Sequence, residues 1–401
     1  MNLTVMMLTW EYPPRIVGGL AAHVHDLSKA LVRRGVDVWV FTPDFPGAPE
    51  REDDEGVKVF RVDSYKHPTP DFASWISMMN INLMKHAAPI VRTLRGKPFM
   101  IHAHDWLVAH SAISLKHVFR VPLVVTIHST EHGRRSGIHD DYQRMISSTE
   151  SWLAREAWRV ICCSRYMVEE VNRALGTPLD KIDLIPNGVY LEKFAPPPSP
   201  DQFKSRYVYP GEKLVLYVGR LVYEKGVHLL LESWPKVLAA VNARLVIVGE
   251  GYLKEWISRR AAELGVSYKI YLPGFLSSQE LRWLYTVADV FVMPSLYEPF
   301  GIVALEASAA GLPIVSTCRG GIGEILSHME TCIRVDPDPD SIAWGIIRVL
   351  TDPGLAEAIR NKARENVAKN YSWDRIGELT LSVYQKIQGE YSSQAHWKPR
   401  V

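Results

Sequence analysis

Short apolar runs alternate with stretches of helical periodicity along the first half of the chain. The run at 3–8 predicts a buried strand, and apolar residues three or four apart after Gly19 predict a helix. Gly35 ends this helix, and the run at 36–42 predicts the next strand. Strand, helix and strand in this order form a βαβ unit, which indicates a parallel sheet with right-handed crossovers. The apolar positions of the helix are Leu20, Val24, Leu27 and Leu31.

The same alternation continues to residue 185 and restarts near residue 214, with helical segments between the apolar runs. The acidic stretch at 50–55 interrupts it and predicts a surface turn. Further strands are expected at 57–62, 99–103, 122–127, 160–163, 182–185, 214–218, 244–248, 269–272, 290–293, 314–316 and 332–335.

A proline-rich run at 195–200 separates the two series. Such a run fits neither a helix interior nor a central strand, and it behaves as a semi-rigid spacer. We therefore predict an α/β fold with two doubly wound, Rossmann-like domains that face each other across a cleft. The expected parts are a first domain at 1–195, a linker at 196–200, a second domain at 201–374, and a C-terminal helix and tail at 375–401 that pack back on the first domain.

Composition and charge narrow the classes of function. The 401 residues carry a net charge of only +2, spread evenly along the chain, which argues against nucleic-acid binding and makes membrane association unlikely. No apolar run approaches the length of a membrane span, and the first charged residue, Glu11, is not preceded by a basic segment. The four cysteines form no C-x-x-C pair. We expect a cytoplasmic, reduced protein.

The stretch from Pro294 to Pro313 carries the main chemical signal. It runs from strand end to loop to helix, with Glu298 in the loop, Gly301 at the helix start and Glu306 inside the helix. A helix N-terminus offers free N–H groups and partial positive charge, which suit a phosphate. Two carboxylates on either side suit the hydroxyl groups of a sugar and of a ribose. The pattern predicts a nucleotide-sugar site, against the alternative of two glutamates on a solvated helix.

Two cations follow the first strand of the second domain. Arg220 comes directly after Gly219, and Lys225 stands at the start of the next helix. Both can neutralise the diphosphate of a leaving nucleotide, although two solvated surface cations remain the alternative. Gly249, which follows the next strand, is interpreted as a second wall of the nucleotide pocket.

The first domain contributes a weaker set of candidates. Gly18 and Gly19 open a helix after the first strand, so their N–H groups could approach a phosphate. His128 follows a predicted strand, and Glu131 and Arg134 lie a few residues further on. This polar cluster favours a functional site, with a purely structural histidine as the alternative.

A third strand end in the first domain carries two histidines and an Asp-Trp pair. His102 and His104 share one strand face, a spacing that some metal sites use, but the sequence completes no ligand set. We prefer a sugar-facing role for Asp105 and Trp106, through hydrogen bonds and stacking. No metal site is predicted.

Together these residues resemble the retaining GT-B glycosyltransferases of the family 4 group, including their glycogen and starch synthase relatives. The match spans nearly the whole chain, and its most specific part is the segment from Glu298 to Glu306. The residues 219–226, the Gly-Gly-Leu20 loop and Pro186-Asn-Gly-Val189 support it. His102-x-His104-Asp-Trp106 looks like the glucan synthase branch.

The resemblance implies a role for each matched position. Arg220 and Lys225 would hold the donor diphosphate, and Glu306 the ribose. Glu298 would contact the donor sugar, helped by N–H groups at Phe300 and Gly301 and next to Ile302. His128 would lie beside the transferred sugar, and Gly19 near the phosphates and the acceptor. The family needs no metal or other cofactor, and it keeps the anomeric configuration.

One departure concerns the N-terminal loop. Glucan synthases often carry Lys-x-Gly-Gly-Leu there, whereas this chain has Arg15-Ile-Val-Gly18-Gly19. The basic residue is therefore an arginine and is one place further away, which weakens a transfer of the donor and acceptor preference.

The resulting hypothesis is a glucosyltransferase that uses ADP-glucose or UDP-glucose and extends an α-glucan or a small glucosyl acceptor. One alternative is a family 4 transferase for mannose or N-acetylglucosamine that acts on a lipid or small polyol. Another is a GT-B-fold epimerase of UDP-sugars. The sequence predicts neither the nucleobase nor the oligomeric state.

Overall fold

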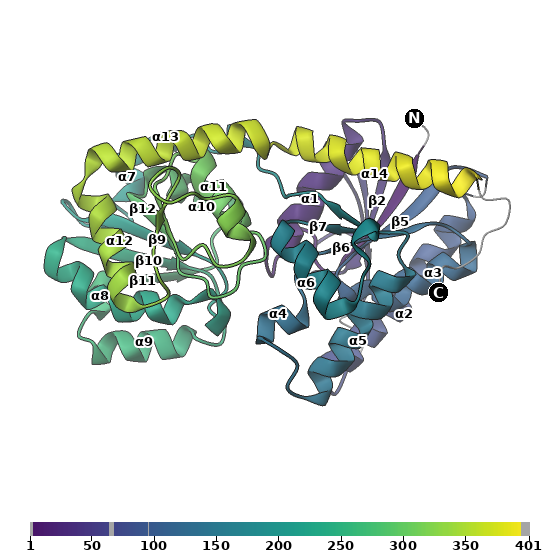
Figure 1. Ribbon diagram of the computed structural model, residues 1–401, viewed down its shortest axis with the longest axis horizontal. Coiled ribbons are helices and arrows are strands. Elements are labelled where there is room, and N and C mark those ends of the chain that lie inside the picture. The colour runs from purple at the N-terminus through teal and green to yellow at the C-terminus, as the bar shows by residue number, and fades with distance from the viewer. Residues whose placement is uncertain (1–2, 64–67, 95, 394–401) are drawn as a thin grey trace. The chain divides into compact units, whose positions relative to one another are not determined.

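The computed structural model describes residues 3–63, 68–94 and 96–393, which form two compact units (Figure 1). Unit 1 combines the chain up to Asn187 with the chain from Trp373 onward, and unit 2 spans Gly188–Ser372. The division falls before the proline run at 195–200, not within it. The backbone N–H of Val189 donates to Tyr371 O at 2.8 Å, which ties residues after Asn187 to unit 2. The predicted tail beyond residue 393 lies outside the described residues.

Unit 1 contains one sheet of eight strands in the order β3-β4-β2-β1-β5-β6-β7-β8. All neighbours are parallel except β3, which pairs antiparallel with β4. The strands confirm the predicted parallel sheet. They are β1 (Thr4–Leu8), β2 (Asp37–Pro43), β3 (Arg51–Asp54), β4 (Val57–Val62), β5 (Phe99–His104), β6 (Leu123–Ile127), β7 (Arg159–Cys162) and β8 (Ile182–Leu184).

The predicted turn at 50–55 is wrong, because β3 occupies most of it. As an edge strand it needs no apolar face, and its acidic side chains protect the exposed edge from pairing with other chains. Lys58 lies opposite Asp53 in the register, and Glu52 forms an ion pair with Arg61 at 2.7 Å. Opposite charges across the pair therefore replace the apolar alternation that sequence reasoning looks for.

Helices cover both faces of this sheet. The helix α14, drawn in yellow in Figure 1, packs against α1. Gly377 allows the close approach, because a Cβ there would lie 3.1 Å from the Cβ of Ala30. The helices of unit 1 are α1 (Gly19–Val32), α2 (Phe72–Arg92), α3 (Ala109–Phe119), α4 (Glu131–Arg135), α5 (Asp141–Glu156), α6 (Arg165–Leu175) and α14 (Trp373–Ser393), with short 3-10 turns η1 (Trp106–Val108) and η2 (Leu179–Lys181).

The C-terminal helix is anchored to unit 1 by buried polar contacts as well as by packing. The hydroxyl of Tyr384 lies 2.6 Å from Nδ1 of His102, whose Nε2 lies 2.7 Å from the Thr126 hydroxyl. This confirms the prediction that the last helix packs on the first domain.

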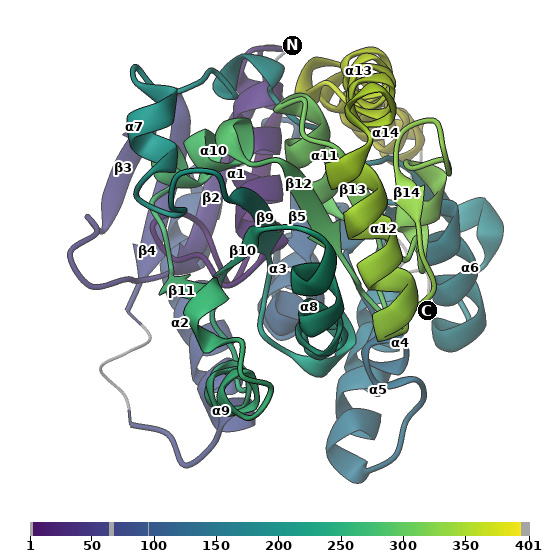
Figure 2. The ribbon, with the colours of Figure 1, turned by 90° about the vertical axis from the view of Figure 1, so that its left-hand side faces the viewer.

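Unit 2 contains a fully parallel sheet of six strands in the order β11-β10-β9-β12-β13-β14. The helices α8 and α12 lie side by side on one face, and α10, α11 and α13 lie on the other (Figure 2). The strands are β9 (Lys213–Val218), β10 (Ala243–Val248), β11 (Ile270–Gly274), β12 (Val290–Met293), β13 (Ile314–Ser316) and β14 (Ile333–Arg334). The helices are α7 (Pro200–Lys204), α8 (Val227–Ala240), α9 (Lys254–Glu263), α10 (Ser278–Val287), α11 (Ile302–Ala309), α12 (Pro339–Thr351) and α13 (Pro353–Asn370), with turns η3 (Leu191–Lys193), η4 (Tyr223–Lys225), η5 (Ser267–Lys269) and η6 (Gly321–Glu324).

The strand order reverses once in each unit, between β1 and β5 and between β9 and β12. In doubly wound sheets the loops at the carboxyl ends of the strands beside such a switch point form the ligand site. No helix in the described part of the chain has the length and apolar character needed to span a bilayer.

Glycines bring the loops at the switch point of unit 2 into backbone contact. Gly226 has φ +67°, and a Cβ there would lie 1.9 Å from the carbonyl oxygen of Pro294, at the end of β12. Gly249 and Gly219 make a similar contact, since a Cβ on Gly249 would lie 2.0 Å from Gly219 O. The loops after β9, β10 and β12 therefore form one packed layer.

We predict that Gly226→Ala destabilises the protein far more than Gly265→Ala. Gly265 has nearly the same φ, +69°, but an added Cβ there meets nothing within 4 Å. The control should therefore cost only the left-handed strain, about 1 kcal/mol, whereas Gly226→Ala adds a backbone clash and should cost about 3 kcal/mol or more. Urea unfolding of both variants measures the difference, and equal losses would show that the contact with Pro294 is unimportant.

Candidate functional site

Lys225 and Glu298 meet at the switch point of unit 2. Lys225 closes the loop after β9, Glu298 lies in the loop after β12, and Lys225 Nζ is 2.7 Å from Glu298 Oε2. The hydroxyl of Ser295 points to the same oxygen at 3.4 Å. Both charged side chains are largely buried. The structure therefore joins two residues that are 73 positions apart and that the sequence assigned to one site.

Backbone hydrogen bonds hold the Glu298 loop on both sides. The N–H groups of Leu296 and Tyr297 donate to Glu224 O at 2.9 and 3.2 Å, which attaches the loop to the turn after β9. On its other side, Glu298 O accepts from Gly321 N at 2.9 Å. The position of the carboxylate is thus set by the backbone and not only by its ion pair.

The helix α11 begins directly after this loop. Gly301, with φ +97°, is its N-cap, and Ile302 is its first residue. Phe300 is buried, and its ring packs edge-on against Tyr371. Glu306 lies further along α11 and accepts a hydrogen bond from the Tyr285 hydroxyl at 3.0 Å. The predicted order of loop carboxylate, helix start and helix carboxylate is therefore present.

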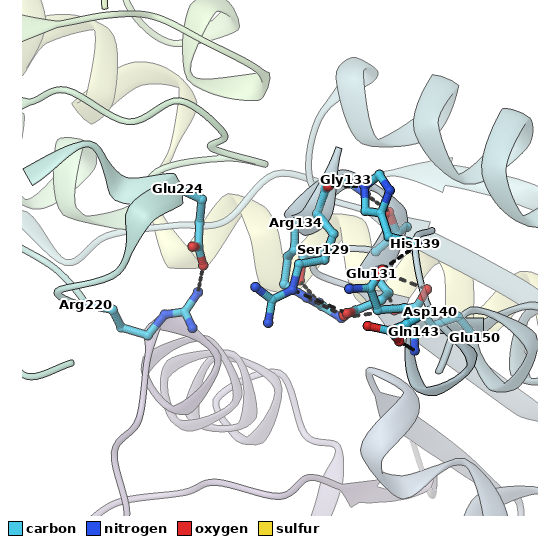
Figure 3. A network of polar contacts seen from close by, with 12 residues as sticks. Ser129, Glu131, Gly133, Arg134, His139, Asp140, Gln143, Glu150, Arg220 and Glu224 are labelled. Carbon is cyan, nitrogen blue, oxygen red and sulfur yellow. Dashed lines mark hydrogen bonds and ion pairs between the residues drawn. The ribbon is translucent and has the colours of Figure 1, made fainter. Parts of the chain in front are cut away.

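Arg220 is more exposed than Lys225. Its guanidinium pairs with Glu224 at 3.2 Å, as Figure 3 shows, and its carbonyl accepts from the Tyr217 hydroxyl at 3.0 Å. Gly249 is expected to form a wall of the nucleotide pocket. Its close contact with Gly219 also requires a glycine at this position, independently of any ligand.

In unit 1, the buried carboxylate of Glu11 accepts the N–H of Gly18, one of the two N–H groups expected to approach a phosphate. Glu11 Oε2 accepts from Val17 N at 2.6 Å and from Gly18 N at 2.9 Å. Burial raises the pKa of Glu11 to about 7, although these two N–H groups and the nearby Arg15 oppose the shift. Gly19 starts α1, and Gly18 is its N-cap. Sequence reasoning missed Glu11 because nothing in the spacing shows that the loop folds back over it.

Three histidines gather at the switch point of unit 1. One ring nitrogen each of His23, His104 and His128 lies within 4.8 Å of the others, and His104 Nδ1 is 3.3 Å from His128 Nε2. Nδ1 of His23 lies 2.6 Å from Asn187 Oδ1. Burial lowers the pKa of all three rings, that of His128 to about 3, so they are neutral at pH 7.

This group differs from the pair that the sequence singled out. His102 bonds Tyr384 and Thr126 instead, so the pattern His102-x-His104 does not form a ligand pair of its own. His23 was missed, although a histidine on the apolar face of the helix after Gly19 is a usable signal. Among the described residues, these three histidines are the group that could hold a metal ion. Their neutral rings suit equally well hydrogen bonds to one another and to a sugar.

Asp105 is hydrogen-bonded to the backbone of His128. Its Oδ1 accepts from the backbone N–H of His128 at 2.7 Å, and burial raises the pKa of this carboxyl to about 6, against the effect of that hydrogen bond. Trp106 is only 7% exposed and belongs to the core. The expected stacking of Trp106 on a sugar is therefore corrected, because the 3-10 turn η1 directs the ring inward and leaves little surface for a ligand.

Glu131 and Arg134 form a buried cluster with Glu150, which sequence reasoning missed (Figure 3). Arg134 Nη2 lies 2.8 Å from Glu131 Oε2 and 3.3 Å from Glu150 Oε1, and Glu131 N donates to Glu150 at 2.9 Å. Arg134 Nη1 also donates to the Ser129 hydroxyl. The cluster ties the loop after His128 to helix α5, so these residues position the loop.

Comparisons with known proteins identify the family. Residues 17–193 match the model for Glycosyltransferase Family 4, and residues 199–366 match that for Glycosyl transferases group 1. An uncharacterised glycosyltransferase of Methanocaldococcus jannaschii is 42% identical over 388 residues, covering 96% of this chain and 98% of that protein. The chain belongs to the family 4 and group 1 glycosyltransferases.

Two further similarities extend this result. A glycogen synthase of Mycobacterium tuberculosis is 37% identical over 400 residues, covering 95% of this glycosyltransferase and 94% of its relative. The sucrose-phosphate synthase of Thermosynechococcus elongatus has the same fold, with a TM-score of 0.83, 24% identity and coverage of 97% and 100%. Recognition of the family and of two parallel-sheet domains of GT-B type is thereby confirmed, while the roles of single residues stay predictions.

We predict that Glu11→Gln changes how the stability of this glycosyltransferase depends on pH. The folded pKa of Glu11, about 7, lies above its ordinary value of 4.5. The folded state therefore binds more protons between these values, and this group makes stability fall as pH rises through that window. Glutamine does not ionise, so the variant should gain about 3 kcal/mol relative to the natural chain between pH 4.5 and 7.5.

Urea unfolding at several pH values measures this effect. Asp141→Asn serves as the control for exchanging a carboxylate for its amide, because the Asp141 side chain is 95% exposed. A pH-independent difference for Glu11→Gln would show that folding leaves the pKa of Glu11 unchanged.

Proposed function

We propose that this glycosyltransferase moves glucose, with retention of configuration, from ADP-glucose or UDP-glucose to an α-glucan or a small glucosyl acceptor. The observation that carries the proposal is the Lys225–Glu298 pair beside the N-terminus of α11, at the switch point of unit 2. The 37% identity to a glycogen synthase supports a glucan acceptor.

In this proposal unit 2 binds the donor. The ammonium of Lys225 has three N–H groups, of which Glu298 takes one, so the others are directed to a diphosphate. Arg220 adds a second cation on the same loop, and together they stabilise the charge that develops as the nucleotide leaves. Glu298 accepts from hydroxyls of the glucose, next to the N–H groups of Phe300 and Gly301, and Glu306 accepts from the ribose.

Unit 1 contributes His128 and the acceptor side. A neutral imidazole can exchange hydrogen bonds with a sugar hydroxyl without adding charge, which fits the low pKa that burial gives His128. Asp105 holds the backbone of His128, while Glu131 and Arg134 hold the loop that follows. These three residues therefore act on the acceptor side by positioning, and Gly18 and Gly19 by shaping the loop above β1.

No metal step is needed in this proposal. Lys225, Arg220 and the start of α11 supply positive charge to the leaving diphosphate, which is the task of Mg²⁺ in other nucleotide-dependent enzymes. The three-histidine group of unit 1 is then a hydrogen-bonding cluster.

A panel of donors tests the proposed reaction. ADP-glucose, UDP-glucose, GDP-mannose and UDP-N-acetylglucosamine are incubated with and without glycogen or maltose, in EDTA, and nucleotide release and product are measured. We expect release with a glucose donor only when the acceptor is present, and an α-linked product by NMR. Release with mannose or N-acetylglucosamine donors alone would overturn the choice of sugar, and UDP release without acceptor would favour epimerisation. Complete loss in EDTA, restored by a metal, would contradict the metal-free proposal.

We predict that Lys225→Ala lowers kcat about 10²–10³-fold, because one preorganised cation is lost from the transition state, which corresponds to about 3–4 kcal/mol. Lys213→Ala is the matched control. Lys213 begins the same strand β9 at its opposite end and pairs with Asp289 at 3.5 Å, so its loss should leave kcat within about twofold. Full activity of Lys225→Ala under saturating donor would refute the diphosphate role.

A further inference from the structure

Two cysteines of unit 2 face each other behind the Glu298 loop. Cys318 follows β13 and Cys332 precedes β14, and these two strands are neighbours in the sheet. Their sulfur atoms are 3.8 Å apart, and both thiols are free. A disulfide requires an S–S distance of about 2.05 Å, so one sulfur must move toward the other for a bond to form.

The two thiols differ in exposure. Cys332 is fully buried, its N–H donates to Ser327 O at 3.2 Å, and its carbonyl accepts from Met329 N at 2.8 Å. Cys318 is 9% exposed and lies in a turn with φ +51°. A small oxidant therefore reaches Cys318 first. Although the N–H of Cys318 donates to the Ser316 hydroxyl at 3.1 Å, we expect the turn that carries Cys318 to shift when the two sulfurs approach each other. Donation from the Cys332 S–H group, more than any other cause, lowers the pKa of Cys318, which favours the reactive thiolate.

The turn that carries Cys318 is bonded directly to the proposed donor loop. The Thr317 hydroxyl donates to Ser295 O at 2.5 Å, and Gly320 forms a β-bridge with Glu298. The two backbones are closely packed here, because a Cβ on Gly320 would lie 2.4 Å from Glu298 O. A shift of Cys318 is therefore transmitted to the backbone of Glu298.

We propose that Cys318 and Cys332 are a modification site, where a reversible disulfide forms and weakens donor binding by displacing Glu298. With a hydroperoxide as oxidant, the Cys318 thiolate attacks the peroxide oxygen, forms a sulfenic acid and releases an alcohol, or water from hydrogen peroxide. Cys332 sulfur then attacks Cys318 sulfur and expels water, so two thiols and one hydroperoxide give a disulfide, the alcohol and water. A dithiol reverses the reaction by exchange.

The other two cysteines are not equivalent to this pair. Cys162 and Cys163 are adjacent at the end of β7, and successive side chains along a strand point to opposite faces. Both are buried, and burial raises the pKa of Cys162 well above its usual value. They provide an internal control.

Mass spectrometry of the full chain tests the disulfide itself, independently of any activity. After hydrogen peroxide treatment we expect the loss of the mass of two hydrogen atoms and a crosslinked peptide pair containing Cys318 and Cys332. Cys318→Ala and Cys332→Ala should each abolish this loss, and Cys162→Ala should retain it. Either substitution suffices if the other variant does not fold. An unchanged mass, or a crosslink that includes Cys162, would overturn the proposal.

Donor binding tests the consequence, which rests on the proposed function. With whichever of UDP-glucose and ADP-glucose turns over, the oxidised chain should show a KM for the donor raised about tenfold, equivalent to about 1.4 kcal/mol, and dithiothreitol should restore it. The Cys332→Ala variant should keep the same KM after peroxide. An unchanged KM in a chain that has lost the two hydrogens would refute the link to Glu298. Absence of turnover with every donor would refute the proposed function, while the mass measurement would still decide the disulfide.

Discussion

The close backbone contact between Gly226 and Pro294 is the constraint on which the proposed donor site of unit 2 depends. It brings the loop after β9 against the end of β12, and only a residue without Cβ allows it. Once the two loops touch, Glu224 O accepts from the loop after β12, and Lys225 reaches Glu298. The ion pair is therefore a consequence of the glycine contact at the switch point. A parallel sheet supplies the two strand ends, and the glycine sets their distance.

Unit 1 differs from unit 2 in that ionisable groups are buried around its switch point. Burial raises the pKa of Glu11, Asp105 and Glu150 and lowers that of the three clustered histidines. Each carboxylate accepts backbone N–H groups, at Val17 and Gly18, at His128, and at Glu131. Groups whose ionisation costs free energy are kept because they hold loops above the strand ends. As a consequence, the stability of unit 1 depends on pH.

The sequence predicted what depends on local pattern, and missed what depends on distant contacts. Apolar runs marked the buried strands, and the spacing of Glu298, Gly301 and Glu306 predicted the order of loop, helix start and helix that is present at α11. The edge strand β3 was not predicted, because its acidic residues show no apolar alternation. Composition predicts the domain boundary at the prolines. The boundary lies after Asn187 instead, because Val189 pairs with the distant Tyr371. The roles of Glu11 and His23 depend on their contacts with Gly18 and Asn187, and the periodicity of the sequence does not reveal such contacts.

Arg220 and Lys225, the two cations of the proposed donor site, each pair with a glutamate, but the two pairs differ in burial. Arg220 and Glu224, four residues apart in the loop after β9, form a partly exposed pair, and surface pairs contribute about 0–1 kcal/mol. Lys225 and Glu298 are more buried, so separating them would leave a charge poorly solvated. An arriving diphosphate would therefore take Arg220 from Glu224 at little cost, and would add to Lys225 without removing Glu298. Because Glu298 then stays hydrogen-bonded to Lys225, its carboxylate is held in place beside the phosphate, where a donor sugar would need it.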